Sequence, residues 1–294
     1  MWRLGVRTAA RVAWNCPSHL PAVLLDRMAL SGSRARSAAV GCGLEGFHLD
    51  TRTLGRVRLL AGGDVHELRE IAVSNMYCAW GFMPRSGWTV LDIGANVGLF
   101  SRWTRGFMRS GLIIAVEPVP LSFHLFWENL GLDGARGAGP TVLPVHAAVS
   151  DHRETLELLV PHGPLGWSAA PGWACAATSP CAEFLDPAGV ERIRVEALPL
   201  DALLAGIPPA HRPTRIDLLK IDVEGMELEC LRGAGATLAA TRRVVFEYHN
   251  PGLRQRCAEV LEAGTFREVL RRAPYGPAMG LSFWTRRGLP LGGR

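Results

Sequence analysis

The sequence predicts an α/β protein with one open, mostly parallel sheet that ends in an antiparallel hairpin. From Phe47 onward, short apolar runs alternate with amphipathic helical stretches, a pattern typical of βαβ units. One of these runs, at 89–93, leads directly into a glycine-rich turn that opens a helix. The length of 294 residues and the 48% hydrophobic content suffice for a sizeable core.

The spacing of apolar residues along the sequence predicts the positions of the individual strands and helices. Parallel strands are expected where short apolar runs are bounded by turn residues, at 89–93, 112–116, 141–149, 216–221 and 243–248. Further strands are expected at 156–160 and 193–198, and the terminal hairpin at 266–270 and 281–285. Helices are expected where the spacing becomes helical, at 97–108, 121–130, 226–238 and 257–263.

Two segments lie outside this regular pattern. Residues 1–46 are interpreted as an appendage of one or two helices or a linker, and residues 47–294 as the main domain. The irregular stretch 161–187, rich in Gly, Pro and Trp, contains Trp167, Trp173 and Phe184. It is interpreted either as a lid that closes over a bound ring or as a hydrophobic cluster that fixes a long loop.

Charge and cysteine content restrict the partners. The formal net charge is +5, but the arginines are spread along the chain, so no nucleic-acid face is indicated. No apolar run approaches the roughly 18 residues of a membrane span. Seven cysteines without a C-x-x-C pair indicate neither a disulfide framework nor a metal knuckle, which favours the cytoplasm. The arginine-rich first 40 residues would also fit organellar import in a eukaryote.

The glycine turn is the sharpest motif. In Asp92-Ile93-Gly94-Ala95-Asn96-Val97-Gly98, a strand passes through glycines into a helix whose first N–H groups are unpaired. Such a turn binds a nucleotide or a nucleoside carboxylate. It departs from the dinucleotide pattern G-x-G-x-x-G, because Asn96 occupies the position of the second glycine.

Glu117 follows the next predicted strand. An acid about 20 residues after the first glycine holds ribose hydroxyls in nucleoside-binding sheets. The alternative, a solvated acid before Pro118, is less consistent with the register of Glu117 and the glycine turn. A nucleoside site is therefore predicted at this edge.

The order of motifs D-I-G-A-N-V-G, V-E-P, E-N-L, A-V-S-D and L-L-K-I-D-V-E-G-M-E resembles the FkbM family of S-adenosylmethionine-dependent methyltransferases, over roughly residues 67–250. The resemblance implies a Rossmann-like class I methyltransferase fold with seven strands, and methylation of hydroxyl groups on sugars, polyketides or related products. It places Asp92, Gly94, Asn96 and Gly98 around the methionine part of the cofactor and Glu117 on the ribose. Ala148, Val149 and Ser150 would flank the adenine, and Tyr77 would approach the cofactor.

Two residues are candidates for the group that takes the acceptor's proton. Asp222 and His249 follow two successive predicted parallel strands, so both are expected at the ligand edge of the sheet. Glu224 and Glu247 are second choices, and Glu224 also reads as an acid in the first turn of a helix. Lys220 is the only lysine and is expected to form an ion pair.

Carboxylates also bind hard cations. Asp222, Glu224 and Glu247 could hold Mg²⁺, although their spacing does not distinguish a ligand set from helix-capping acids.

Three other classes of function compete with a small-molecule methyltransferase. An NAD-dependent oxidoreductase would need the three-glycine fingerprint, which is absent. A non-catalytic nucleoside-binding or interaction protein would keep the fold without the chemistry, but Asp92, Glu117 and Asp222 are all present. An RNA methyltransferase would need a basic face, and Arg102, Arg105 and Arg109 fit solvated surface positions better.

Overall fold

The computed structural model describes residues 47–51, 53–59, 62–131, 139–161, 174–185, 189–274 and 276–290. The predicted appendage at 1–46 lies outside the described residues. So does most of the insertion 161–187, including Trp167 and Trp173 and the side chain of Phe184.

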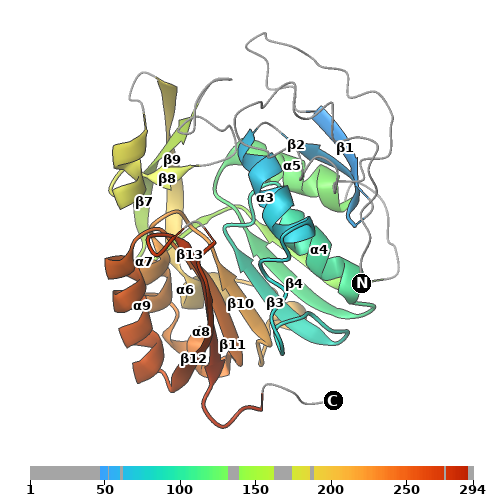
Figure 1. Cartoon of the computed structure of the whole chain (residues 1–294), viewed down its shortest axis with the longest axis vertical. Coiled ribbons are helices and arrows are strands. Elements are labelled where there is room, and N and C mark those ends of the chain that lie inside the picture. Colours follow the sequence, from blue (N-terminus) through green and yellow to red (C-terminus); the bar gives the residue numbers. More distant parts are fainter. Residues whose placement is uncertain are drawn as a thin grey trace.

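The centre of the molecule is a seven-stranded sheet (Figure 1). Its strands, in spatial order, are β12 (Phe266–Arg272), β13 (Gly280–Arg286), β11 (Arg243–Tyr248), β10 (Leu218–Ile221), β3 (Trp88–Ile93), β4 (Gly111–Val116) and β5 (Thr141–Val145). All neighbours from β11 to β5 are parallel, whereas β13 is antiparallel to both β11 and β12. This order and orientation are those of the class I methyltransferase fold, which confirms the predicted sheet and its terminal hairpin.

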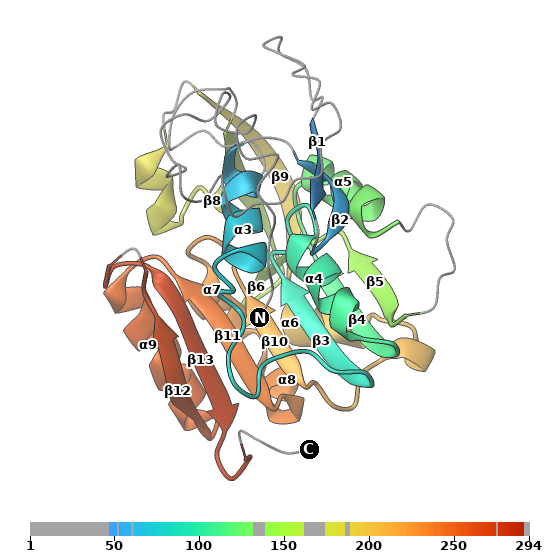
Figure 2. The same cartoon turned by 45° about the vertical axis from the view of Figure 1, so that its right-hand side comes forward.

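Helices cover both faces of this sheet (Figure 2). One face packs against α3 (Gly62–Ala72), α4 (Leu99–Phe107) and α5 (Pro120–Leu130). The opposite face packs against α6 (Leu200–Ala205), α7 (Glu227–Arg232), α8 (Gly235–Ala240) and α9 (Pro251–Ala263). Because both faces are covered, the parallel strands are apolar on both sides, as a buried parallel sheet requires.

The predicted single strand at 141–149 is wrong. It is split into β5 and a separate β6 (Ala148–Ser150), and β6 belongs to a second sheet with the order β6-β9-β7-β8. The other members are β7 (Glu154–Pro161), β8 (Cys175–Ala176) and β9 (Val190–Pro199). The apolar character continues across the break, so periodicity could not locate it. A hairpin of β1 (Phe47–Thr51) and β2 (Gly55–Leu59) precedes α3 and was not predicted.

The predicted helix at 226–238 is also interrupted. It forms α7 and α8, which are separated at Gly233. A β-carbon on Gly233 would lie 2.2 Å from the carbonyl oxygen of Ser150, so this close approach requires glycine. The helix predicted at 257–263 begins earlier, at Pro251, where the Asn250 side chain accepts a hydrogen bond from the backbone N–H of Leu253.

No helix in the described part of the chain is long and apolar enough to cross a membrane.

Candidate functional site

The glycine turn lies between β3 and α4, at the carboxyl edge of the sheet. Gly94 adopts φ of +77°, and a β-carbon there would lie 1.7 Å from the carbonyl oxygen of Asp222. Gly98 adopts φ of +86°, and a β-carbon there would meet the Phe126 ring at 2.7 Å. Gly94 therefore allows β10 to approach the turn, whereas Gly98 allows α5 to pack behind it. Helix α4 starts without a side-chain cap, which leaves its first N–H groups available to an anion.

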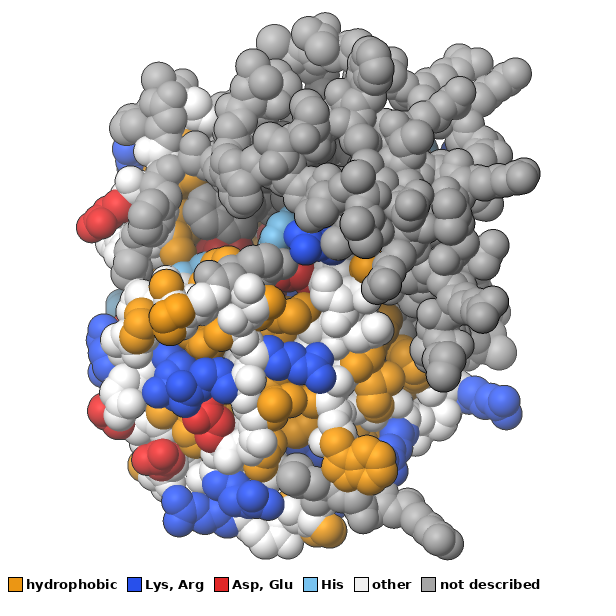
Figure 3. All heavy atoms as spheres, in the orientation of Figure 1, with side chains coloured by type: hydrophobic (Ala, Val, Ile, Leu, Met, Phe, Trp, Pro, Cys, Tyr) orange, Lys and Arg blue, Asp and Glu red, His pale blue; other side chains and the backbone are white. Residues whose placement is uncertain are grey.

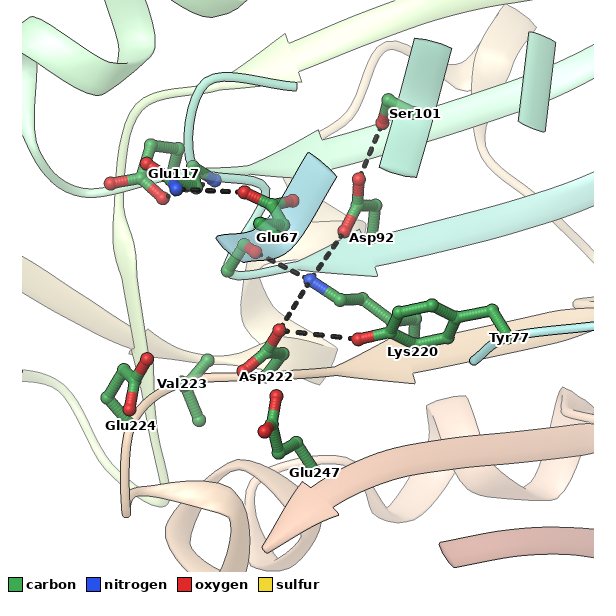
Figure 4. Close-up of polar contacts among 12 residues, drawn as sticks. Glu67, Tyr77, Asp92, Ser101, Glu117, Lys220, Asp222, Val223, Glu224 and Glu247 are labelled. Atoms are coloured by element: carbon green, nitrogen blue, oxygen red, sulfur yellow. Dashed lines mark hydrogen bonds and ion pairs between the residues drawn. The ribbon is translucent and has the colours of Figure 1, made fainter. Parts of the chain in front are cut away.

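A buried ion cluster joins β3 to β10. Asp92 and Lys220 are register partners, so their side chains project from the same face of the sheet. Lys220 Nζ lies 3.2 Å from Asp92 Oδ1 and 3.3 Å from Asp222 Oδ2, and it donates to the carbonyl oxygen of Gly94 at 2.7 Å (Figure 4). Ser101 donates to the other Asp92 oxygen at 2.6 Å. The predicted ion pair of Lys220 is confirmed, and Asp92 supports the turn through Lys220 and Ser101.

Burial alone would lower the pKa of Lys220, but Asp92, Asp222 and Glu67 outweigh it and raise the pKa. Burial likewise acts to raise the pKa of Asp222, yet Lys220, His249 and a hydrogen bond from Glu247 bring it below its usual value. Asp222 is therefore ionised at the edge of the sheet. Burial and the charge of Asp222 raise the pKa of the neighbouring Glu247 carboxyl well above its usual value.

Glu117 faces the glycine turn, as the sequence predicts. Its Oε2 accepts from the backbone N–H of Asn96 at 2.9 Å and its Oε1 from that of Val119 at 2.8 Å. Burial raises the pKa of Glu117 to about 7 despite these two bonds. Each carboxylate oxygen accepts more than one hydrogen bond, so the group keeps capacity for the hydroxyls of a ribose.

Helix α3 contributes two acids to the site that sequence reasoning missed. The Asn96 side-chain amide donates to Glu67 Oε2 at 2.9 Å and to Asp64 Oδ1 at 3.2 Å. Burial, followed by nearby acids, raises the pKa of Glu67 well above its usual value in spite of Lys220. Both acids lie in an amphipathic stretch where they read as surface residues. Only the packing of α3 on α4 brings them to the turn.

Tyr77 lies at the same edge. Its hydroxyl donates to Asp222 Oδ2 at 3.4 Å (Figure 4). Its ring packs edge-on against Phe100 of α4. Tyr77 therefore contacts the carboxylate beside the glycine turn.

His249 and Glu224 meet at the ends of β11 and β10. His249 Nε2 lies 3.0 Å from Glu224 Oε2 and 4.0 Å from Glu247 Oε1. Burial acts to lower the pKa of His249, but Glu224, Glu247 and Glu227 raise it well above its usual value. Glu224 is not in a helical first turn as expected: it precedes α7 with φ of +54°, a left-handed conformation that a non-glycine residue adopts at a cost of roughly 1–2 kcal/mol.

The expected Mg²⁺ ligands Asp222, Glu224 and Glu247 do not converge. Among the described residues, the groups whose ligand atoms all come within 4.8 Å of one another are Cys181–Glu224–His249 and Asp151–His152–Glu154.

The three residues assigned to the adenine, Ala148, Val149 and Ser150, form the buried strand β6. The Ser150 hydroxyl donates to Glu154 Oε1 at 2.5 Å. Their role toward an adenine stays a prediction.

The charge distribution on one face agrees with a small-molecule site. Acidic and histidine side chains lie near the middle of this face beside a basic side chain, and basic and acidic side chains are interspersed over its lower part (Figure 3). No continuous basic band of the kind that tracks a nucleic-acid backbone crosses the described residues visible in this view.

The fold and the turn define a class I methyltransferase. A family model for the methyltransferase FkbM domain matches residues 92–274. The chain is 31% identical to Methyltransferase sdnD of Sordaria araneosa over 202 residues, which cover 64% of this chain and 77% of that protein. It is 29% identical over 205 residues to the AMB antimetabolite synthetase AmbE of Pseudomonas aeruginosa, covering 62% of this chain and 9% of the synthetase.

Among solved structures, the methyltransferase FkbM of Methylobacillus flagellatus KT matches with a TM-score of 0.46 and 16% identity, covering 72% of this chain and 47% of that one. The chain thus spans about half of that solved chain and a small part of the antimetabolite synthetase. The chain belongs to the FkbM family of S-adenosylmethionine-dependent methyltransferases.

The residues at the turn fit this cofactor. Asn96 Oδ1 is buried and has no hydrogen-bond partner in the described part of the chain, so it offers an acceptor to the cofactor's amino group. The uncapped start of α4 suits the carboxylate, and Glu117 suits the ribose.

Proposed function

We propose that this chain transfers a methyl group from S-adenosylmethionine to a hydroxyl oxygen of a sugar or another natural product. The observation that carries the proposal is the position of Asp222, an ionised carboxylate at the carboxyl end of β10 beside the glycine turn. The similarity of this chain to part of an antimetabolite synthetase supports the proposal that the acceptor is a small metabolite. The lack of a continuous basic band on the face drawn in Figure 3 favours such a molecule over a nucleic acid.

The glycine turn and its neighbours hold the cofactor in this proposal. When bound, S-adenosylmethionine supplies a methyl group on a positively charged sulfur, which an oxygen nucleophile displaces in line. Asn96 and the first turn of α4 bind the methionine end, and Glu117 binds the ribose. Asp92, Gly94 and Gly98 shape the turn from behind. Ala148, Val149 and Ser150 flank the adenine.

Asp222 takes the proton of the acceptor. Lys220 holds its Oδ2 at 3.3 Å and Tyr77 donates to the same oxygen at 3.4 Å, which fixes the carboxylate. An orienting contact of this kind places a base against one hydroxyl, and the carboxylate oxygens keep lone pairs that can accept the acceptor's proton. His249 and Glu224, on the adjoining strand end and turn, line the acceptor site next to Asp222. The proposed methyltransferase domain spans residues 47–294.

The test is a transfer assay with methyl-labelled S-adenosylmethionine and a panel of sugars and hydroxylated metabolites, with the methylated atom located by NMR. Asp222→Asn should reduce the transfer rate by roughly 100- to 10,000-fold, the range for loss of a general base. Binding of S-adenosylhomocysteine should persist, because Asn keeps the size of the side chain.

Glu268→Gln is a matched control. Glu268 lies on β12, where it accepts from Arg271 and Ser282 away from the glycine turn, so its loss should leave transfer unchanged. Methylation of nitrogen or carbon, or full activity of Asp222→Asn, would refute the proposed O-methylation.

A further inference from the structure

Three described residues with metal-binding side chains converge beside the proposed acceptor site. Cys181, Glu224 and His249 each offer one ligand atom, and these atoms all lie within 4.8 Å of one another. They come from three distant segments: the short helix Pro180–Phe184, the turn after β10 and the residue after β11. This separation explains why cysteine spacing in the sequence indicated no metal site.

The backbone holds two of these segments together. The Ser179 hydroxyl donates to the carbonyl oxygen of Glu224 at 2.6 Å and accepts from the backbone N–H of Cys181 at 3.1 Å. One hydroxyl thus links the cysteine to the left-handed turn that carries Glu224. The thiol is buried, with the Cys181 residue 3% exposed, so it is a fixed ligand and not a mobile surface group.

His249 has the surroundings of a metal-ligating histidine. Nε2 faces Glu224, whereas Nδ1 lies 3.9 Å from Oε1 of Glu227, which is fully buried. Glu227 Oε1 is itself fixed by the backbone N–H groups of Val223 and Gly225, at 3.3 and 3.1 Å. Carboxylate, imidazole and metal in line is the usual arrangement by which proteins orient a histidine ligand.

Unpartnered atoms point to a ligand missing from this pattern. His249 Nδ1 and Glu227 Oε2 are buried and have no hydrogen-bond partner in the described part of the chain. Buried polar atoms are nearly always satisfied, so two unpaired atoms at and beside one imidazole require an explanation.

We propose that Cys181 Sγ, Glu224 Oε2 and His249 Nε2 bind a zinc-class divalent cation, with the buried Glu227 carboxylate facing the Nδ1 side of His249 and moving within hydrogen-bond distance of it when the cation binds. A thiolate together with an imidazole selects zinc-like cations over Mg²⁺ and Ca²⁺, which prefer oxygen ligands. Binding forms three metal–ligand bonds and releases the thiol proton of Cys181 and the imidazolium proton of His249 to solvent. Three protein ligands leave a fourth tetrahedral position for water, as in zinc sites that remain open.

The second cluster does not qualify. Asp151, His152 and Glu154 lie at the surface, offer no sulfur, and already pair with one another.

The test uses the full chain, stripped of metal by a chelator and titrated with Co²⁺ as a spectroscopic probe and then with Zn²⁺ in competition. We expect one equivalent to bind, with a sulfur-to-cobalt charge-transfer band and the intense visible bands of a tetrahedral site. Cys181→Ser should abolish the charge-transfer band. Glu227→Gln should keep the band but weaken the affinity by about 10- to 100-fold, the usual effect of losing a carboxylate that orients a histidine.

Cys78→Ser is the matched control, because Cys78 is a half-buried thiol that contacts Asn75 far along the chain from the cluster. It should leave the band and the stoichiometry unchanged. A charge-transfer band that survives in Cys181→Ser, or absence of stoichiometric binding by the folded wild-type chain, would overturn the site. Should Cys181→Ser fail to fold, Glu224→Gln tests the site from a partly exposed ligand, because it should remove stoichiometric Co²⁺ binding. S-adenosylhomocysteine binding, measured in each variant, reports separately on the cofactor site of the proposed methyltransferase.

Discussion

At the scale of single residues, Gly94 shows how a backbone position rather than a functional group controls the site. An alanine there would be strained twice, by its left-handed φ and by a β-carbon 1.7 Å from the Asp222 carbonyl. Gly87 has φ of +82° but nothing within 4 Å of a β-carbon, so it shares only the first cost. A comparison of substitutions at Gly94 and Gly87 therefore separates the cost of the left-handed backbone conformation from the cost of the steric clash.

Gly87→Ala should therefore destabilise the chain by roughly 1–2 kcal/mol, the cost of the left-handed region. Gly94→Ala should cost clearly more and should abolish S-adenosylhomocysteine binding, because β10 must move away from the turn. Urea unfolding and calorimetric titration measure the two effects. Equal destabilisation by both substitutions, with binding retained, would show that the contact with Asp222 does not govern the turn.

The candidate site was predicted where sequence position alone fixes geometry. Residues that directly follow parallel strands must lie at the same edge of the sheet, which is why the sequence predicted Asp222, Glu117 and His249 at one edge. Glu67 and Cys181 were missed because their approach depends on how α3 and the segment around Pro180 pack, and local pattern does not record such packing. The spacing of apolar residues can be recognised in a single sequence, but a contact between two residues far apart in the chain cannot.

At the scale of elements, the break between α7 and α8 follows from one tight contact. Gly233 lets this junction touch β6, since a β-carbon would lie 2.2 Å from the Ser150 carbonyl and 3.1 Å from Pro199. The apolar period runs through the break, so the sequence predicted one helix. In the same way, the apolar run 141–149 hid the passage of the chain from the main sheet to the second sheet. The spacing of apolar residues therefore indicates which residues are buried, but it does not indicate where the chain changes direction.

Gly233→Ala should destabilise the chain by about 1–3 kcal/mol, because overpacking moves α7 away from β6. Gly235→Ala, two residues further on in α8, is its control: the nearest atom to a new β-carbon is Asp201 Oδ2 at 3.7 Å. A glycine replaced by alanine in an open helical position should be neutral or stabilising by up to roughly 1 kcal/mol. Thermal unfolding of the two variants checks the sign; loss of stability in both would assign the effect to the helices rather than to β6.

At the scale of the whole molecule, the acidic site makes stability depend on pH. Burial raises the pKa of Glu117 from 4.5 to about 7, and it raises those of Glu67 and Glu247 as well. A carboxyl whose pKa is higher in the folded state binds its proton more tightly there. Its contribution to stability is thus complete below pH 4.5 and is lost as the pH rises through about 7.

The free energy of unfolding of the cofactor-free chain should accordingly fall as the pH rises from about 5 to about 8. Glu117→Gln should flatten this profile between pH 4.5 and about 7, since the amide does not titrate. For Glu117 the change is at most about 3 kcal/mol, from the value of one pKa unit. Urea unfolding across the pH range measures the difference between variant and wild type, and parallel profiles would show that Glu117 titrates normally.

Glu128 makes the stability of the same fold depend on pH in the opposite direction. A hydrogen bond from Arg58 is the main cause that lowers the pKa of Glu128 on α5, so its contribution to stability is present above pH 4.5 and lost as the pH falls. Glu128→Gln should therefore lose stability relative to wild type at neutral pH and approach it in acid. As the pH rises, the free energy of unfolding of Glu117→Gln should increase relative to wild type, whereas that of Glu128→Gln should decrease. This opposite behaviour requires that burial of the acid at the cofactor site carries a desolvation cost. A ligand bound there would have to offset that cost.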